Sequence, residues 1–348
     1  MNSIILSYIN HYLDNFKPYK QGKWCYEDGI LMNAIWQLGN NLKDNYYHSF
    51  VFKYYDEMIE ESGKIKNYHL DDYNIDNILP GLGLLALKDE NLKFNKAIYH
   101  LEQQLINQPR TKSGSFWHKA RYPYQIWLDG IYMGQVFYVQ TSIASALEDV
   151  IHQLKNVDKL LFNHDKKLYV HAYDESKQMP WANRKTGQSP NAWLRSIGWM
   201  AMALVDLEEI SHHPFIQKMF NKVIESMVVY RQDNELWYQL VEYPKLVNNY
   251  EETSGNLMMA YALLKAERLG LLELKHQGLG LQIFKLVIDK KLKNNHLFDI
   301  CQVAGLDSAH RDGSINYYLS EPIVKDEVKG VAPLILAFTE ILKLNIKK

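Results

Sequence analysis

A unit that recurs six times along the chain constrains the fold more than any other feature. Each copy begins with a short polar or charged segment, here called a polar lead, and continues with small and apolar residues at helical spacing. The polar leads are residues 26–29, 74–77, 128–130, 193–196, 252–255 and 326–330. The runs behind them, such as residues 30–38, 197–207 and 331–342, are apolar on nearly every side, which is typical of buried helices. The pattern therefore predicts an inner set of buried helices.

Segments with a one-sided apolar stripe and many charges lie between these runs, as at residues 95–105 and 215–227, and indicate solvent-facing helices. Alternating buried and amphipathic helices predict an all-α fold, an (α/α)6 toroid, with short β-hairpins in its connections at residues 168–173 and 236–241. Because no Pro/Gly/Ser-rich linker divides the chain, residues 1–348 are expected to form a single domain. If the inner helices are parallel, the polar leads converge on one rim, which is the predicted functional face.

Composition narrows the possible partners and the compartment. Lys and Arg total 39 against 40 acidic residues, so no overall field draws the chain to nucleic acid or a lipid surface. No apolar run approaches the ~20 residues that cross a bilayer, and the N-terminus lacks a basic n-region and a cleavage site. We therefore expect a cytoplasmic protein. Cys25 and Cys301 are too few for a disulfide framework and are expected to be reduced core thiols.

Two polar leads place an aspartate at the mouth of an inner helix. Asp129 lies in the sequence WLDGIYMG at residues 127–134, and Asp76 lies in YNIDN at residues 73–77. A carboxylate at a helix N-terminus is often only a stabilising cap. Two carboxylates that face one cavity repel, however, so that one of them can hold a proton and act as a general acid. We expect Asp129 and Asp76 to form such a pair.

Arg195 and His171 are the other polar candidates. Arg195 lies in an apolar inner helix between two tryptophans, where burial without an anion is costly. Its structural interpretation is a salt bridge to Asp76, Asp129 or Asp174, and its functional interpretation is a forked grip on a substrate carboxylate. His171 is expected in a hairpin or loop over the rim, either as a hydrogen-bonded loop residue or as a substrate contact.

Tryptophans gather around the polar leads, where they could stack on sugar rings. They are Trp117, Trp127, Trp181, Trp193 and Trp199, of which two or three are expected only to pack. Neither HExxH nor CxxC occurs, so the sequence predicts neither a metal site nor a cofactor. These features point to a carbohydrate-active enzyme.

At these residues the sequence resembles glycoside hydrolase family 105, the unsaturated rhamnogalacturonyl hydrolases, and more distantly the family 88 unsaturated glucuronyl hydrolases. The resemblance runs from residue 24 to residue 331 and is strongest in YNID (73–76), WLDGIYM (127–133), WAN (181–183), GQSP (187–190), WLRSIGW (193–199), DGS (312–314) and YLSEPI (318–323). The chain departs from the family pattern at Gln135-Val136 and at Asn256, both expected near the rim.

The resemblance implies an (α/α)6 barrel and a substrate that ends in the 4,5-unsaturated uronic acid left by a polysaccharide lyase. Asp129 then matches the general acid/base and Asp76 the second carboxylate. The implied substrate contacts are His171, Arg195, Trp193 and Trp199, with Tyr73, Trp127 and Met133 beside them in the matching motifs. The reaction implied is hydration of the C4=C5 double bond, which differs from attack at the anomeric carbon by two carboxylates.

Other functions remain open at this point. The leading substrate is an unsaturated galacturonyl-rhamnose from pectin-derived rhamnogalacturonan. A family 88-like hydrolase of glycosaminoglycan fragments is the alternative enzyme, and a sugar-binding toroid without catalysis is the non-enzyme alternative. An epimerase of the same barrel type is less favoured because such sites rely on paired histidines, and the rim offers only His171 and His118. The sequence leaves the aglycone and the oligomeric state undetermined.

Overall fold

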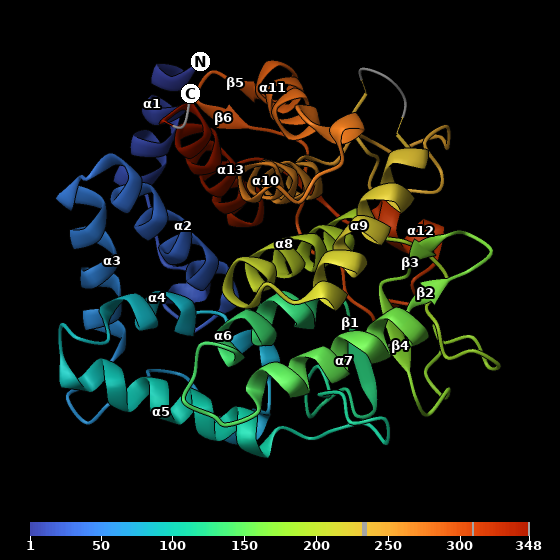
Figure 1. Cartoon of the computed structure of the whole chain (residues 1–348), viewed down its shortest axis with the longest axis horizontal. Coiled ribbons are helices and arrows are strands. Elements are labelled where there is room, and N and C mark those ends of the chain that lie inside the picture. The colour runs from blue at the N-terminus through green and yellow to red at the C-terminus, as the bar shows by residue number, and fades with distance from the viewer. Residues whose placement is uncertain (232–234, 308–309, 347–348) are drawn as a thin grey trace.

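The computed structural model describes residues 1–231, 235–307 and 310–346, and it is a closed ring of helices (Figure 1). The inner helices are α2 (Tyr26–Leu42), α4 (Gly81–Leu87), α6 (Val136–Tyr138), α8 (Leu194–Ser211), α10 (Thr253–Leu269) and α13 (Val328–Ile346). A π-helix, η4 (Ile131–Gln135), leads directly into α6. Each inner helix contacts the next one along the chain, and α13 closes the ring against α2.

The outer helices are α1 (Asn2–Asp14), α3 (Asn45–Met58), α5 (Leu92–Asn107), α7 (Ala146–Leu160), α9 (Pro214–Val229) and α11 (Leu279–Lys291). Most of them pack on the inner helix that precedes them in the chain. A hydrogen bond from Tyr8 to Asp326 joins helix α1 to the segment just before α13. The labelled N and C ends of the chain also lie close together in Figure 1. The predicted (α/α)6 toroid is confirmed.

Two inner helices, α4 and α6, are short. Helix α4 begins only at Gly81, after Pro80, because the polar lead before it folds as a short 3-10 helix, η3 (Ile75–Asn77). The run behind Asp129 forms one turn of π-helix before the short α6. Such π-turns are uncommon and are often found at functional sites.

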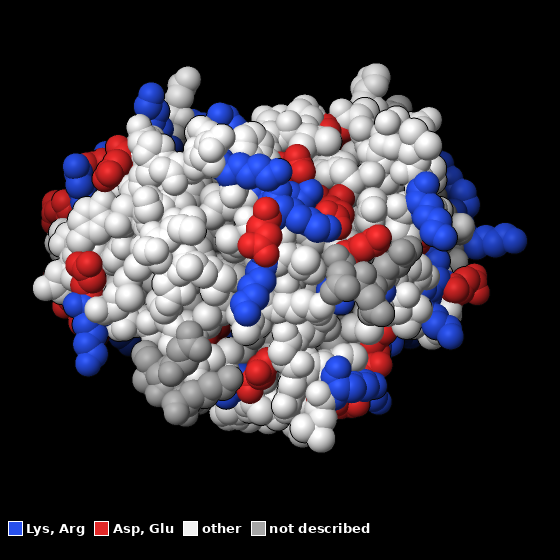
Figure 2. Space-filling model, turned by 90° about the horizontal axis from the view of Figure 1, so that it is seen from above, with Lys and Arg blue, Asp and Glu red and all other residues white. Residues whose placement is uncertain are grey.

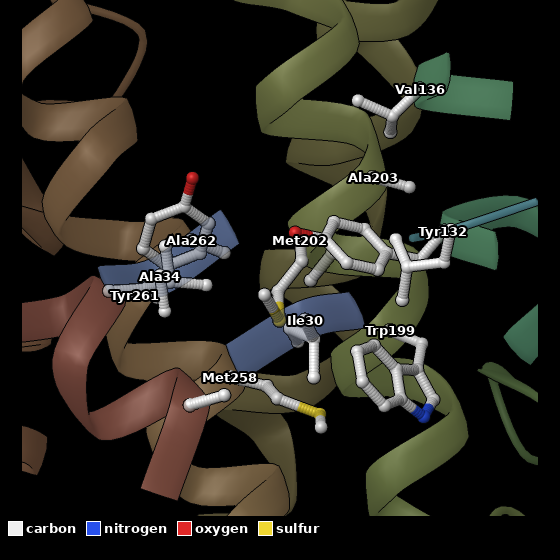
Figure 3. Close-up of a cluster of buried hydrophobic side chains, with 14 of the residues drawn as sticks. Ile30, Ala34, Tyr132, Val136, Trp199, Met202, Ala203, Met258, Tyr261 and Ala262 are labelled. Atoms are coloured by element: carbon white, nitrogen blue, oxygen red, sulfur yellow. The ribbon is translucent and has the colours of Figure 1, made fainter. Parts of the chain in front are cut away.

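Apolar side chains from the inner helices fill the centre of the ring (Figure 3). Trp199 of α8 stacks on Tyr132 of the π-helix with ring centroids 5.3 Å apart. Figure 3 also shows Ile30 of α2 and Met258 of α10 in this cluster. The centre of the toroid is therefore a packed core, and any site must lie above it at the rim.

The strands form four two-stranded antiparallel pairs in the connections. They are β1 (Gln125–Trp127) with β4 (Ala172–Asp174), β2 (Phe162–Asn163) with β3 (Leu168–Tyr169), β5 (Leu292–Lys293) with β6 (His296–Leu297), and β7 (Ile300–Cys301) with β8 (Ile323–Val324). The strand signal at residues 168–173 is thus confirmed, although it divides between two pairs. Residues 236–241 form only isolated bridges, including Trp193 with Leu240, so the hairpin expected there is wrong.

The remaining elements are short. They are the 3-10 helices η1 (Tyr19–Gln21), η2 (Leu70–Asp72) and η5 (Leu274–His276), together with α12 (Ile315–Ser320). Figure 2 shows acidic and basic side chains intermixed over the face drawn, in keeping with the balanced charge of the sequence. Among the helices that the structure describes, none combines the length and apolarity needed to cross a membrane.

Candidate active site

A cavity of about 750 Å³ opens where the first three polar leads meet. Tyr26 and Glu27 come from the first lead, Asp76 from the second and Asp129 from the third. Residues 302–305 and Arg311 close the opposite wall. The convergence predicted for all polar leads therefore holds for three of them at the cavity itself.

The antiparallel pair of β1 and β4 sets Asp129 and His171 beside one another. Trp127 pairs with Ala172 in these strands, and the Leu128 N–H donates to the carbonyl of His171 at 3.0 Å. Asp129 therefore begins its inner helix directly against the histidine. The distance from His171 Nε2 to Asp129 Oδ2 is 3.0 Å, but the N–H direction is not aligned for a hydrogen bond. His171 was expected in a loop over the rim. It is fully buried instead and lies beneath the rim.

Asp76 is held in η3 and is paired with a lysine. The Asn74 side chain accepts a hydrogen bond from the Asp76 N–H at 3.2 Å. Lys119 Nζ lies 2.5 Å from Asp76 Oδ2, and His118 Nε2 lies 3.5 Å from Oδ1. Burial raises the pKa of Asp76, but the charge and hydrogen bond of Lys119 outweigh burial and hold this pKa below its ordinary value. Asp76 is therefore an anion whose charge Lys119 compensates, which weakens its repulsion toward Asp129.

Arg195 is buried under the rim and is committed to protein groups. Its Nε donates to Ser254 Oγ at 2.7 Å, its Nη2 lies 3.3 Å from Glu252 Oε1, and Nη2 also donates to the carbonyl of Cys301. The salt bridge expected from the sequence exists, but its partner is Glu252 and none of the three aspartates considered. Only Nη1 is without a hydrogen-bond partner among the described residues. The grip on a substrate carboxylate stays a prediction that depends on this one nitrogen.

Among the aromatic candidates, Trp127 lines the cavity and the others do not. Trp127 stacks on His118 at 4.5 Å and on Tyr122 at 5.3 Å between ring centroids. Trp193 and Trp199 are 2% and 1% exposed and pack on protein rings, so their contact with a sugar stays a prediction.

Of two other predicted substrate contacts, Met133 lines the cavity and Tyr73 does not. The backbone carbonyl of Tyr73 accepts a hydrogen bond from Gln108 Nε2 at 2.7 Å. The Tyr73 side chain is not among the cavity-lining groups.

The two departures from the family pattern are not at the rim. Gln135 is buried and donates to Gln153 Oε1 at 3.0 Å, and Asn256 is buried and donates to the carbonyl of Trp237 at 2.7 Å. Both are held by hydrogen bonds inside the ring and neither lines the cavity, so the expectation that they lie near the rim is wrong. The cysteines, by contrast, are buried and free as expected.

The sequence did not reveal Lys119 or residues 302–305. Lys119 lies in a loop without helical or strand periodicity, and its only local signal is adjacency to His118 and Tyr122. Residues 302–305 belong to no polar lead and reach the cavity because β7 pairs with β8. Partners that are distant in sequence leave no periodic trace.

The cavity wall carries charges of both signs and suits an acidic sugar near its cations. The cations are Lys20, Lys23, Lys119, Arg121 and Arg311. Asp129, an accessible aspartate at a helix N-terminus, can transfer a proton. Asp76, which is paired with Lys119, can orient a ligand. In the part of the chain that the structure describes, no group of three or more His, Cys, Asp or Glu is placed to hold a metal ion.

His118 should make the stability of the fold depend on pH. Burial lowers the pKa of this imidazole from 6.5 to about 4. Between these values the unfolded chain binds a proton that the folded chain does not, so the free energy of unfolding falls as pH drops from 6.5 toward 4. The loss is about 3 kcal/mol at most. We expect His118→Gln to remove this slope in denaturant unfolding at several pH values. An unchanged slope in His118→Gln would assign the effect to another group.

Comparisons with known proteins agree with this arrangement. The family model described as Glycosyl Hydrolase Family 88 matches residues 2–345. The structure of a family 105 glycoside hydrolase from C. acetobutylicum ATCC 824 is 37% identical, covers 97% of this chain and 98% of its own, and superposes with a TM-score of 0.91. Protein Atu3128 of Agrobacterium fabrum is 39% identical over 193 residues, which are 51% of this chain and 83% of that protein.

A more distant structure shows the same fold. The unsaturated glucuronyl hydrolase of Bacillus sp. GL1, responsible for the degradation of glycosaminoglycan, is 13% identical and has a TM-score of 0.67 over 97% of this chain and 94% of its own. At that identity the likeness concerns the fold alone. The family model covers all the cavity residues, and the family 105 structure covers nearly the whole chain. The chain therefore belongs to the glycoside hydrolases of families 88 and 105, with the higher sequence identity to a family 105 member.

Proposed function

We propose that this enzyme removes a terminal 4,5-unsaturated uronic acid from oligosaccharides that a polysaccharide lyase has generated. The observation that carries the proposal is Asp129, which opens into the cavity at a helix N-terminus with His171 behind it. The proposed substrate is an unsaturated galacturonyl-rhamnose from rhamnogalacturonan, in line with the family 105 relative. The unsaturated glucuronyl hydrolases among the structural neighbours keep glycosaminoglycan-type fragments as the second candidate.

The proposed reaction is hydration of an enol ether. Asp129 donates its proton to C4, and positive charge develops at C5 beside the ring oxygen. Water adds at C5 while Asp129 accepts a proton from it, which returns the carboxyl group to its starting form. The resulting hemiketal opens to a 5-keto product, and the aglycone leaves with its glycosidic oxygen protonated. One water is consumed in each cycle.

Asp76 has a separate part in this proposal. Because Lys119 keeps the pKa of Asp76 low, Asp76 stays ionised throughout the cycle and does not compete as a proton donor. An anion in this place can accept hydrogen bonds from sugar hydroxyls or from the attacking water.

A panel of purified lyase-generated disaccharides tests the proposal. Loss of the ultraviolet absorbance of the conjugated double bond reports hydration directly. We expect turnover of unsaturated galacturonyl-rhamnose at a kcat/KM well above that of unsaturated glucuronyl disaccharides from glycosaminoglycans. The opposite order would assign the second substrate class. Binding of both disaccharides without turnover of either would favour the sugar-binding toroid.

A further inference from the structure

Asp129 is the first member of a buried chain of polar side chains that leads away from the cavity. His171 follows it, and Tyr318 of α12 lies behind the histidine. The distance from His171 Nδ1 to the Tyr318 hydroxyl is 2.7 Å, across a separation of 147 residues. His171 and Tyr318 are both fully buried. The chain therefore connects the proposed acid to a phenol that solvent does not reach.

The imidazole of His171 is held on both sides. Its ring lies 4.8 Å from Trp193 and 5.3 Å from Trp127 between centroids. Its backbone carbonyl accepts from the Leu128 N–H at 3.0 Å. The ring thus presents Nε2 to Asp129 and Nδ1 to Tyr318, and exchange of the two nitrogens would require these aromatic neighbours to move.

Among the described residues, His171 Nε2 and Asp129 Oδ2 have only each other as possible hydrogen-bond partners. Both atoms are buried and have no hydrogen-bond partner among the described residues, although they lie 3.0 Å apart. Rotation of the carboxylate about its terminal bond, a soft torsion, would align the contact. Catalytic hydrogen bonds are often poorly aligned before substrate binds. A proton on Nε2 would satisfy both atoms, whereas a lone pair there would face the lone pairs of Oδ2.

The Tyr318 hydroxyl decides which nitrogen carries that proton. Neutral imidazole has one N–H, and a phenol that donates to Nδ1 leaves the proton on Nε2. Burial raises the pKa of Tyr318 well above its ordinary value, so the phenol keeps its hydrogen throughout the working pH range. Tyr318 is therefore suited to be a constant donor.

We propose that Tyr318 is a positioning residue that fixes His171 in its Nε2–H form, so that Asp129 Oδ2 always accepts from His171 and Oδ1 carries the reacting proton into the cavity. The inference rests on the proposed role of Asp129. Without the phenol, His171 can protonate at Nδ1 instead, and the carboxyl proton of Asp129 can then move to Oδ2 and bind the free Nε2. In that arrangement the proton faces the protein and not C4.

Tyr318→Phe tests this role because it removes only the hydroxyl. We expect kcat to fall by roughly tenfold or more, in line with the larger loss that the wrong histidine tautomer causes in serine proteases, while KM changes little. A donor to the carboxylate favours its charged form, so its loss should move the basic limb of the kcat profile to higher pH by about half a unit or more. A merely structural role would not move that limb.

Several titratable groups face this chain from neighbouring elements and remain in place in Tyr318→Phe. They are Tyr26, Asp76, His118, Glu242, Cys301 and Tyr317. Tyr261→Phe is the matched control. Tyr261 is a fully buried phenol on α10 that donates to Asp206 at 2.7 Å and does not line the cavity. The Tyr261→Phe variant should lose stability, but the basic limb of its kcat profile against pH should not shift.

Two further results decide the proposal. In a His171→Gln background, Tyr318→Phe should produce no additional loss of kcat, because the imidazole whose tautomer Tyr318 fixes is already absent. If Tyr318→Phe fails to fold, 3-fluorotyrosine at position 318 retains the hydroxyl as a stronger donor and should move the basic limb to lower pH. An unchanged limb in both position-318 variants, or additive losses with His171→Gln, would overturn the role of Tyr318. Failure of the Asp129 assignment would be visible separately, as activity in Asp129→Asn.

Discussion

Asp129→Asn should abolish turnover while the protein remains folded and still binds substrate. The amide has nearly the shape of the carboxyl group but cannot donate its proton to C4 or accept one from water. Loss of general acid/base catalysis costs on the order of 10²–10⁴ in rate, or more when one group serves both steps. The measurement is kcat for the unsaturated disaccharide, with circular dichroism and ligand binding to verify the fold.

Asp72→Asn is the matched control for this experiment. Asp72 also lines the cavity but is exposed and lies in η2, away from the inner helix mouths. Asp72→Asn removes the same charge as Asp129→Asn. We expect the kcat of Asp72→Asn to remain within about threefold of the unaltered enzyme, because an exposed charge is well screened. Activity in a folded Asp129→Asn protein comparable to that of Asp72→Asn would remove Asp129 from the mechanism.

Arg195→Met should lower the free energy of unfolding more than any other single change considered. It would leave the fully buried Glu252 side chain without its cation. Removal of one partner of a buried ion pair typically costs about 3–5 kcal/mol. Denaturant unfolding measures the loss directly. Arg184→Met, at an exposed arginine, is the control and should change stability by less than about 0.5 kcal/mol.

A double variant separates the two interpretations of Arg195. Arg195→Met with Glu252→Gln removes both charges and should recover part of the lost stability, because a Gln oxygen in the Oε1 position can still accept from the Ser254 and Cys301 N–H groups. If Arg195→Met instead kept its stability and showed only a raised KM, the arginine would serve the substrate and the structural role would be wrong.

The sequence predicted the ring and the position of Asp129 because both follow from local periodicity. Each polar lead marks the start of an inner helix. Asp129 lies at such a start, in the short motif at residues 127–134. Where the local signal was interrupted, prediction was less successful. Pro80 delays α4, and nothing in the run behind Asp129 indicated a π-helix.

The partners of the candidate residues could not be predicted in the same way. Arg195 binds Glu252 across 57 residues, and His171 meets Tyr318 across 147. Such pairs depend on how the connections fold over the rim, and no periodic pattern records that. Burial was equally hidden, since Trp193 and Trp199 flank a predicted site residue in sequence but face the core.

The measurement that tests the central claim most directly is the position of deuterium after turnover in heavy water. The carboxyl group of Asp129 exchanges with solvent before each cycle, so proton donation to C4 must deposit one deuterium on that carbon. The reaction is quenched early, because later enolisation of the 5-keto product would also introduce label, and the product is examined by NMR. Hydration predicts deuterium at C4 in a single stereochemical position in every early product molecule. An early product without deuterium at C4 would contradict the account and indicate direct attack at the anomeric carbon.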